Sequence, residues 1–318
     1  MNWYFYRFRF YNNSNMTFLS YKRKKFLLKM LSFFSVIRGY NILVLVIAQY
    51  LTSIYIFAPE KRWIDVLFDP YLFLIVLASA LAIAGGYIIN NFYDAEKDLI
   101  NRPNKALFDN YVSQKTKLTV YFILNFLSVI LASIISLRAV LFFSLYIFIL
   151  WFYSHKLKKY PFIGNLTASI LTITPFFAIF VYYKNFALVI FVHATFLFLI
   201  ISIRELTKDL ASLQGDFAQN YKTIPVVYGE KTSKILLTAL SIITLIPIYL
   251  LLSKFDIGYM QFYFYGCIVF LLIFIGYLWF STKKIQYILL QTLLKFIILI
   301  GIFSIALIEA DILLRKIL

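Results

Sequence analysis

Residues 71–103 have the sequence YLFLIVLASALAIAGGYIINNFYDAEKDLINRP. The first part, 71–93, contains no charged residue, and it is long enough to cross a bilayer core, which takes about 20 residues in a helix. The second part places acids directly at the end of this apolar run, where charge is costly and is usually kept for a function. The stretch therefore predicts a membrane helix with a polar site at its end.

The whole chain has the composition of a protein with several membrane spans. Of its 318 residues, 62% are hydrophobic and 14% are charged, whereas a soluble domain has about 25% charged residues. The apolar residues form continuous blocks rather than alternating patterns, which favours helices over the strands of a membrane barrel. We expect nine spans, at about 39–57, 71–93, 118–137, 139–154, 162–183, 185–203, 235–253, 258–280 and 296–312.

The formal net charge of +17 is distributed unevenly along the chain. Of the 31 Lys and Arg residues, 23 lie in the segment up to Arg38 and in the loops after the second, fourth, sixth and eighth spans, and Lys295 lies at the start of the last span. Positive charge concentrates in the cytoplasmic loops of membrane proteins. We therefore expect the N-terminus and both acidic clusters to face the cytoplasm. Anionic membrane lipid accounts for the basic excess, and no nucleic-acid partner is expected.

The chain divides into a short tail and one membrane domain. Residues 1–29 are basic and aromatic without a cleavable leader pattern, so we expect a disordered tail or an incorrectly assigned start, since Met16 and Met30 are both possible first residues. Residues 30–318 form the membrane domain. Its first eight spans make two halves of four, and each half has an acidic cluster after its second span.

These two acidic clusters carry the predicted chemistry, in long loops at 94–117 and 204–234. Asn90, Asp94 and Asp98 are spaced four apart, so on a helix they share one stripe. Hard oxygen ligands of this kind suit Mg²⁺, which binds one or two carboxylates together with substrate phosphates. Asp209 and Asp216 share a face if their helix continues that far. Each cluster alone could be solvated loop acids, but two at matching positions favour a site.

Basic side chains accompany both clusters, as a site for a magnesium diphosphate requires. The acids would hold the metal, and the cations would neutralise the remaining phosphate charge. Setting the membrane orientation explains some of these charges as well. The basic residues that we expect to contact substrate are Arg102, Lys158, Arg204, Lys208 and Lys222.

Together these residues resemble the UbiA superfamily of intramembrane prenyltransferases. The first motif is Asn-x-x-x-Asp-x-x-x-Asp followed by Asn-Arg-Pro, and the second is Arg-Glu-x-x-Lys-Asp, then Gly-Asp and Tyr-Lys-Thr-Ile-Pro. The segment Leu157–Asn165 and Asn41, at the start of the first span, also resemble family positions. The resemblance covers roughly residues 30–312 and implies an all-α integral membrane bundle of nine helices, as two four-helix halves plus one.

The resemblance implies Mg²⁺-dependent transfer of a prenyl group from a prenyl diphosphate to an acceptor in the membrane. Asn90, Asp94 and Asp98 would hold one metal ion, and Asp216, with Asp209, a second. Asp94, Asp98 and Asp216 would be the catalytic carboxylates, and Asn41 would contact substrate.

The wording of the motifs is most similar to the digeranylgeranylglyceryl phosphate synthase-like branch, whose acceptor is a prenylated glycerol phosphate. The 4-hydroxybenzoate and homogentisate branches, whose aromatic acceptors serve quinone biosynthesis, are the alternative. A bacterial inner membrane is the expected location.

Two positions depart from the family pattern. Asn91 stands where an aspartate is usual, and Ser212 stands where the second motif usually has an aspartate, so that Asp209 would have to replace it. These departures keep open an inactive isoprenoid-binding relative. A transporter is a further alternative, although transporters usually place their charges at the bilayer midplane on broken helices.

Overall fold

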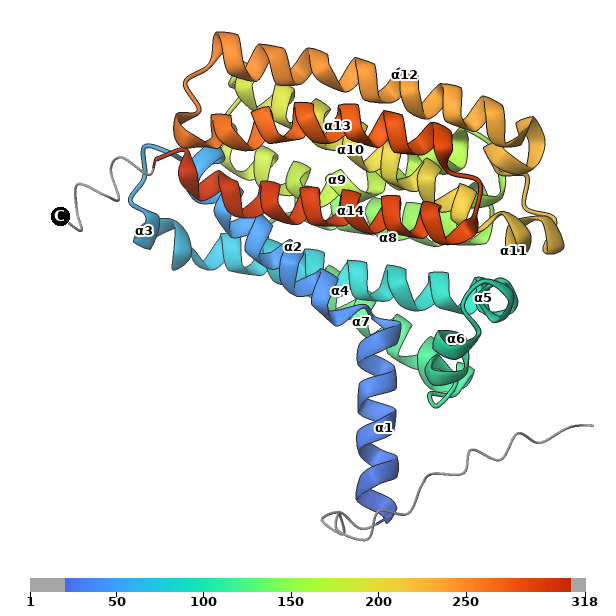
Figure 1. Cartoon of the computed structure of the whole chain (residues 1–318). Helices are drawn as coiled ribbons and strands as arrows, with labels where there is room; N and C mark the ends of the chain where they lie inside the picture. The colour runs from blue at the N-terminus through green and yellow to red at the C-terminus, as the bar shows by residue number, and fades with distance from the viewer. Residues whose placement is uncertain (1–20, 310–318) are drawn as a thin grey trace, which may run out of the picture.

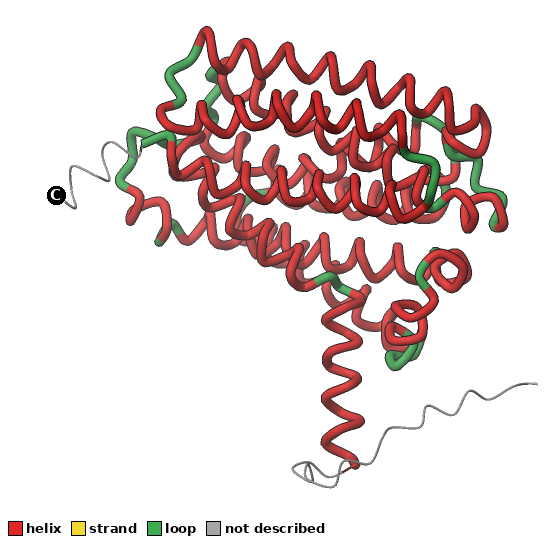
Figure 2. Tube along the Cα trace, in the orientation of Figure 1, coloured by secondary structure: helices red, strands yellow, loops and turns green. Residues whose placement is uncertain are grey.

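The computed structural model describes residues 21–309, and every regular element within this range is a helix (Figure 2). Nine of the described helices are long and apolar enough to cross a membrane, which confirms the predicted number. Residues 1–20 of the tail predicted over 1–29 lie outside the described range. Residues 21–29 belong to a helix, α1.

The membrane-crossing helices run alongside one another and make the bundle in Figure 1. They are α2 (Gly39–Thr52, continued by η1, Ser53–Phe57), α4 (Pro70–Tyr93), α7 (Gln114–Ile135), α8 (Leu137–His155), α9 (Ile163–Tyr183), α10 (Leu188–Ala211), α12 (Ile224–Lys254), α13 (Gln261–Phe280) and α14 (Lys284–Ser304). The shorter elements are α1 (Tyr21–Val36), α3 (Trp63–Leu67), α5 (Ala95–Asn101), α6 (Pro103–Asp109), α11 (Leu213–Ala218), η2 (Leu157–Lys159), η3 (Gly258–Met260) and η4 (Ile305–Leu307).

The two larger of three apolar cores correspond to the two halves of the chain. The first is built mainly by α2, α4, α7, α8 and α9, and the second by α10, α12, α13 and α14. Helix α4 is apolar all round, as expected for a helix with protein on most sides. Its small residues, including Ala78, Ala82 and Gly86, let neighbouring helices approach closely.

Three predicted boundaries were wrong. Helix α14 begins at Lys284 rather than near 296, so Lys295 lies inside the helix and not at its start. Helix α10 continues to Ala211, which places Arg204–Asp209 on its last turns rather than in a loop. Residues from Ile224 are already helical, and α12 continues after a break at Gly229, whose φ is 81°. Hydropathy alone ends a span at the first charges, whereas the polar end of α10 includes the buried Glu205.

Helix α1 runs across the bundle rather than along it (Figure 1). The chain turns at Arg38, whose φ is 51°. A Cβ on the next residue, Gly39, would lie 2.0 Å from the Phe34 ring, so that ring would have to move. Ser32 and Ser35 donate hydrogen bonds to Phe108 O and Asp109 Oδ1, at 2.9 and 2.8 Å. Helix α1 is thereby fastened to α6, which follows the first acidic cluster.

Candidate functional site

The first acidic cluster lies where α4 passes into α5, at the end of the bundle that also holds α6 and α11 (Figure 1). Asp94 joins the two helices. The backbone N–H of Asp94 donates to Asn90 O at 2.9 Å, and that of Asp98 donates to Asp94 O at 2.8 Å. Because α4 ends at Tyr93 and α5 begins at Ala95, Asn90 and Asp98 lie on different helices, and the predicted single stripe is interrupted at Asp94.

Asp94 is surrounded by donors from distant parts of the chain. Lys158 Nζ lies 2.7 Å from Asp94 Oδ1 and also donates to Asn90 Oδ1 at 3.1 Å, while the Tyr221 hydroxyl donates to Asp94 Oδ1 at 3.1 Å. Burial alone would raise the pKa of Asp94, but Lys158 and Lys97 outweigh it and hold the pKa well below its usual range. Asp94 is therefore a charged carboxylate.

Asp216, on α11, brings the second acidic cluster to the same place. Its side chain is 1% exposed, and Lys97 Nζ lies 3.1 Å from Asp216 Oδ1 and 3.7 Å from Asp94 Oδ1. One ammonium thus bridges carboxylates from the two halves of the protein. Neither carboxylate oxygen of Asp216 accepts a well-formed hydrogen bond. Burial raises the pKa of Asp216, although Lys97 opposes the shift.

Tyr221 lies at the centre of this arrangement, and the sequence reasoning missed it. Besides its bond to Asp94, its ring has Lys97 Nζ 4.5 Å, Lys159 Nζ 5.3 Å and Lys158 Nζ 5.9 Å from its centroid. Cations over an aromatic face are attracted to it. Burial and the charge of Asp94 raise the pKa of Tyr221, so its hydroxyl stays a donor. Its place in the Tyr-Lys-Thr-Ile-Pro motif was the available signal.

The expectation that Asp209 and Asp216 share one continuous helix was wrong, because α10 ends at Ala211 and α11 begins at Leu213. The break lies at Ser212, whose carbonyl accepts a hydrogen bond from Asn101 Nδ2 at 3.3 Å. Asp209 nevertheless lies within electrostatic range of Asp216. Its Oδ2 accepts a hydrogen bond from Asn165 Nδ2 at 2.8 Å.

Asn101 connects the two acid-bearing segments, which the sequence did not indicate. In addition to its bond to Ser212 O, its Oδ1 accepts from the Gly215 backbone N–H at 3.2 Å. A Cβ on Gly215 would lie 2.3 Å from Asn101 Nδ2, so any larger residue would displace the Asn101 side chain. Asn101 therefore fastens the end of α5 to the beginning of α11, directly beside Asp216.

Two of the predicted substrate-binding residues gather around a buried acid that the sequence reasoning did not single out. Arg204 and Lys208 both donate hydrogen bonds to the carboxylate of Glu205, which is 5% exposed. The charge of Lys208 also acts on Asp94, Asp209 and Asp216. The Glu205 cluster is thus next to the acidic site.

The remaining predicted basic and polar residues lie further out. Arg102 ends α5 with an exposed side chain, although its charge acts on Asp98. Lys222 is also exposed, and only its backbone reaches the site, by donating to Lys159 O at 2.8 Å. Asn41 Nδ2 lies 3.4 Å from the Tyr87 hydroxyl, on the neighbouring helix α4.

Asn91, which departs from the family pattern, belongs to a separate buried network. Its Nδ2 donates to Asp109 Oδ2 at 3.0 Å, and its Oδ1 accepts from Lys117 Nζ at 2.8 Å. Lys117 and Asp109 are each 1% exposed. An amide suits this position because it can donate to one charged partner and accept from the other.

The acidic residues fit a Mg²⁺ ion whose remaining ligands come from the substrate. No three His, Cys, Asp or Glu side chains within residues 21–309 form a ready metal cage. Magnesium does not require one, because it is usually held by one or two carboxylates plus phosphate and water oxygens. Asp216 offers buried carboxylate oxygens that face the Lys97 ammonium, and the same ammonium lies 3.7 Å from Asp94 Oδ1.

Comparison with known sequences places this chain among membrane prenyltransferases. The model of the UbiA prenyltransferase family matches residues 42–307. A digeranylgeranylglyceryl phosphate synthase of Methanobrevibacter smithii is 31% identical over 239 residues, which are 71% of this chain and 80% of that protein. Enzymes of the same name from Thermococcus gammatolerans and Thermococcus sibiricus are 34% and 38% identical, and the chain spans 64% and 58% of their lengths.

Solved structures share the fold. One, described as digeranylgeranylglyceryl phosphate synthase in membranes, has a TM-score of 0.66 at 23% identity. The match covers 88% of this chain and 98% of that chain. Another, a UbiA homologue from Archaeoglobus fulgidus bound to GPP and Mg²⁺, has a TM-score of 0.62 at 16% identity, with 86% and 99% covered.

Proposed function

Because this chain belongs to the UbiA prenyltransferase family, an integral membrane family, we propose that it transfers a prenyl group from a prenyl diphosphate to a prenylated glycerol phosphate. The observation that carries the reaction class is the single Lys97 ammonium between Asp94 and Asp216. It joins the acidic motifs of both halves at one point. The acceptor class is supported by the name of the relatives from Methanobrevibacter and Thermococcus.

Asp94 and Asp216 would hold Mg²⁺, with Asn90, Asp98 and Asp209 as further oxygen ligands. Bound there, Mg²⁺ would supply positive charge to the diphosphate leaving group. Lys97 and Lys158 stand in the acidic site with Asp94, so they are positioned to pair with phosphate oxygens when substrate enters.

The proposed reaction breaks the bond between C1 of the prenyl chain and the diphosphate oxygen. The electron pair leaves with pyrophosphate, and an allylic cation remains. The acceptor hydroxyl oxygen then bonds to C1 and releases its proton. The residues of this chain contribute by stabilising the charge that develops on the leaving oxygen, which is usually the largest single catalytic effect. Tyr221 positions Asp94 through its hydrogen bond.

We also propose that the end of the bundle with the acidic site faces the cytoplasm. The support is the concentration of Lys and Arg in the loops at that end. A bacterial inner membrane stays a prediction, since the relatives from Methanobrevibacter and Thermococcus are archaeal.

The test is pyrophosphate release by the purified full-length protein in detergent, with geranylgeranyl diphosphate, Mg²⁺ and separate acceptors. The acceptors are prenylglycerol phosphate, 4-hydroxybenzoate and homogentisate. We expect turnover with prenylglycerol phosphate that requires Mg²⁺ and is lost in Asp94→Ala.

The matched control is Asp65→Ala, which removes an exposed acid on α3, at the opposite end of the bundle. This variant should keep its activity. Turnover with an aromatic acceptor alone would refute the proposed acceptor but keep the reaction class. Donor binding without turnover on any acceptor would refute the proposed function.

A further inference from the structure

Lys295 is an ionisable residue deep in a membrane span. It lies eleven positions after Lys284, the first residue of α14, which is about 16 Å along the helix axis. The hydrocarbon core is about 30 Å thick, so this depth is near the middle of the span. Its side chain is exposed rather than packed inside the bundle. A charge at that depth is expensive and indicates a function.

The positive charge of Lys295 is influenced by other cations from distant segments. Arg38, Arg102 and Arg204 all lie within electrostatic range of it, and Glu205 is the acid that acts on it. Glu205 already accepts hydrogen bonds from Arg204 and Lys208. The group therefore has a surplus of positive charge, which an anionic ligand would neutralise.

Two of these cations have N–H groups that donate no hydrogen bond within the described part of the protein. Arg204 Nε is buried and has no hydrogen-bond partner, which is costly for a charged group unless a ligand satisfies it. The Arg38 guanidinium lies 4.9 Å from the centre of the Tyr87 ring. The Tyr87 hydroxyl in turn lies 3.4 Å from Asn41 Nδ2. Arginine forks of this kind match the oxygens of a phosphate.

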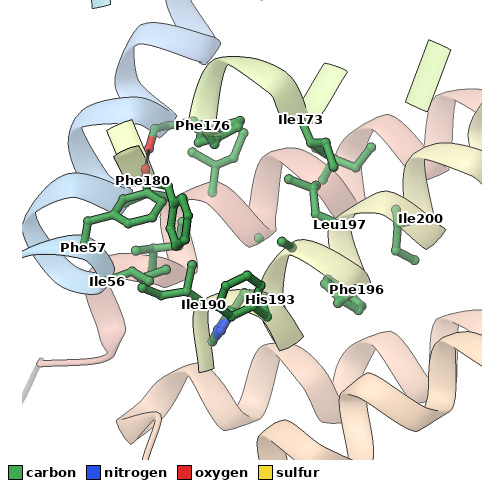
Figure 3. Close-up of a pocket in the computed structure, with 18 of the residues that line it drawn as sticks. Ile56, Phe57, Ile173, Phe176, Phe180, Ile190, His193, Phe196, Leu197 and Ile200 are labelled. Atoms are coloured by element: carbon green, nitrogen blue, oxygen red, sulfur yellow. Dashed lines mark hydrogen bonds between the residues drawn. The ribbon is translucent and has the colours of Figure 1, made fainter. Parts of the chain in front are cut away.

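An apolar cavity of about 130 Å³ lies among α2, α9, α10 and α14 (Figure 3). Two of these helices, α10 and α14, also carry Arg204 and Lys295. On α14, Ile298 and Ile302 follow Lys295 by three and seven positions, and on α10, Ile200 and Leu197 precede Arg204 by four and seven.

Asn41 bears the same relation to the cavity on α2, since Ala48 follows it by seven positions and lines the wall. Side chains at these spacings share a helix face. Arg204, Lys295 and the apolar cavity walls of α10 and α14 therefore lie on common helix faces.

We propose that Arg38, Arg204 and Lys295 bind the phosphate of the acceptor lipid, with its apolar chain directed into the cavity. This inference rests on the proposed function and adds a second anion site to it. The donor diphosphate would occupy the Asp94–Asp216 site, and the Glu205–Lys208 pair is within electrostatic range of both places, since Lys208 acts on Asp94 and Glu205 acts on Lys295. Two anionic substrates thereby receive separate sets of cations.

The experiment compares Lys295→Gln with wild-type protein in detergent, with geranylgeranyl diphosphate as donor. The acceptors are geranylgeranylglycerol phosphate and geranylgeranylglycerol, which lacks the phosphate. A hydrogen bond to a charged group is worth about ten- to hundredfold in affinity. We expect the KM for the phosphorylated acceptor to rise by this factor, with an unchanged donor KM and no difference between the proteins on the phosphate-free acceptor.

Three controls keep the result interpretable. Lys295→Arg should restore the KM, because it retains the charge. Lys231→Gln removes an exposed charge on α12 and should behave as wild type. Equilibrium binding of geranylgeranylglycerol phosphate without donor provides a readout that does not depend on turnover. If Lys295→Gln fails to fold, Arg204→Gln replaces it.

The outcomes separate this inference from the proposed function. A rise in the donor KM, an equal loss on both acceptors, or unchanged acceptor binding would each overturn the phosphate site. If the wild-type protein used only aromatic acceptors, the proposed acceptor would be wrong. Absence of lipid-phosphate binding to that protein would then overturn the phosphate site as well.

Discussion

The contact between Gly215 and Asn101 leads to a quantitative prediction for Gly215→Ala. The new Cβ would lie 2.3 Å from Asn101 Nδ2, 2.7 Å from Cγ and 2.9 Å from Oδ1. Atoms do not approach so closely, so the Asn101 side chain must leave. It then loses its hydrogen bonds to Ser212 O and Gly215 N. At about 0.5–1.5 kcal/mol for each bond, the loss is about 1–3 kcal/mol.

The same displacement should lower the rate, because the two bonds fasten α11 and therefore Asp216 to the end of α5. A misplacement of about 1 Å in an active site can cost about 100-fold. We expect kcat/KM for prenyl transfer to fall by about ten- to hundredfold. The temperature of half-inactivation in detergent should fall with it.

A double-mutant cycle tests whether this contact is the cause. Asn101→Ala should carry nearly the whole penalty by itself, and adding Gly215→Ala to it should change little, because the obstacle is gone. The matched control is Gly266→Ala on α13, where a Cβ would meet nothing within 4 Å. That variant should be neutral or slightly stabilising, since alanine suits a helix interior better than glycine. Additive losses from Gly215→Ala and Asn101→Ala would refute the reasoning.

Two further substitutions examine the surroundings of the site. Tyr221→Phe keeps the ring near Lys97 but removes the hydrogen bond to Asp94, so steady-state kinetics should show catalytic efficiency reduced by about tenfold; wild-type kinetics would mean that Asp94 needs no positioning by Tyr221. Asn91→Asp restores the usual family residue and keeps an acceptor for Lys117, but it replaces the Nδ2 donor to Asp109 with a carboxylate oxygen. Thermal inactivation should therefore show a destabilisation of about 1–3 kcal/mol without a gain in turnover. A more active Asn91→Asp variant would mean that position 91 serves the acidic site after all.

The sequence was sufficient for the features that depend on local composition and spacing. The nine spans followed from continuous apolar blocks, because a bilayer accepts only helices of that length and character. The four-residue spacing of Asn90, Asp94 and Asp98 predicted the backbone hydrogen bonds between these positions, but it did not predict the break between α4 and α5 at Asp94.

The tertiary structure alone decided which groups meet. Tyr221 and Asp94 are 127 positions apart in the chain, and Asn101 and Gly215 are 114 apart. No local pattern relates such residues, because their distance depends on how the two halves of the bundle pack. The same holds for Lys295, which hydropathy placed at a helix start. Its depth in the span became visible only when α14 proved to begin at Lys284, with polar residues of its first turns facing protein groups such as Asn101 O.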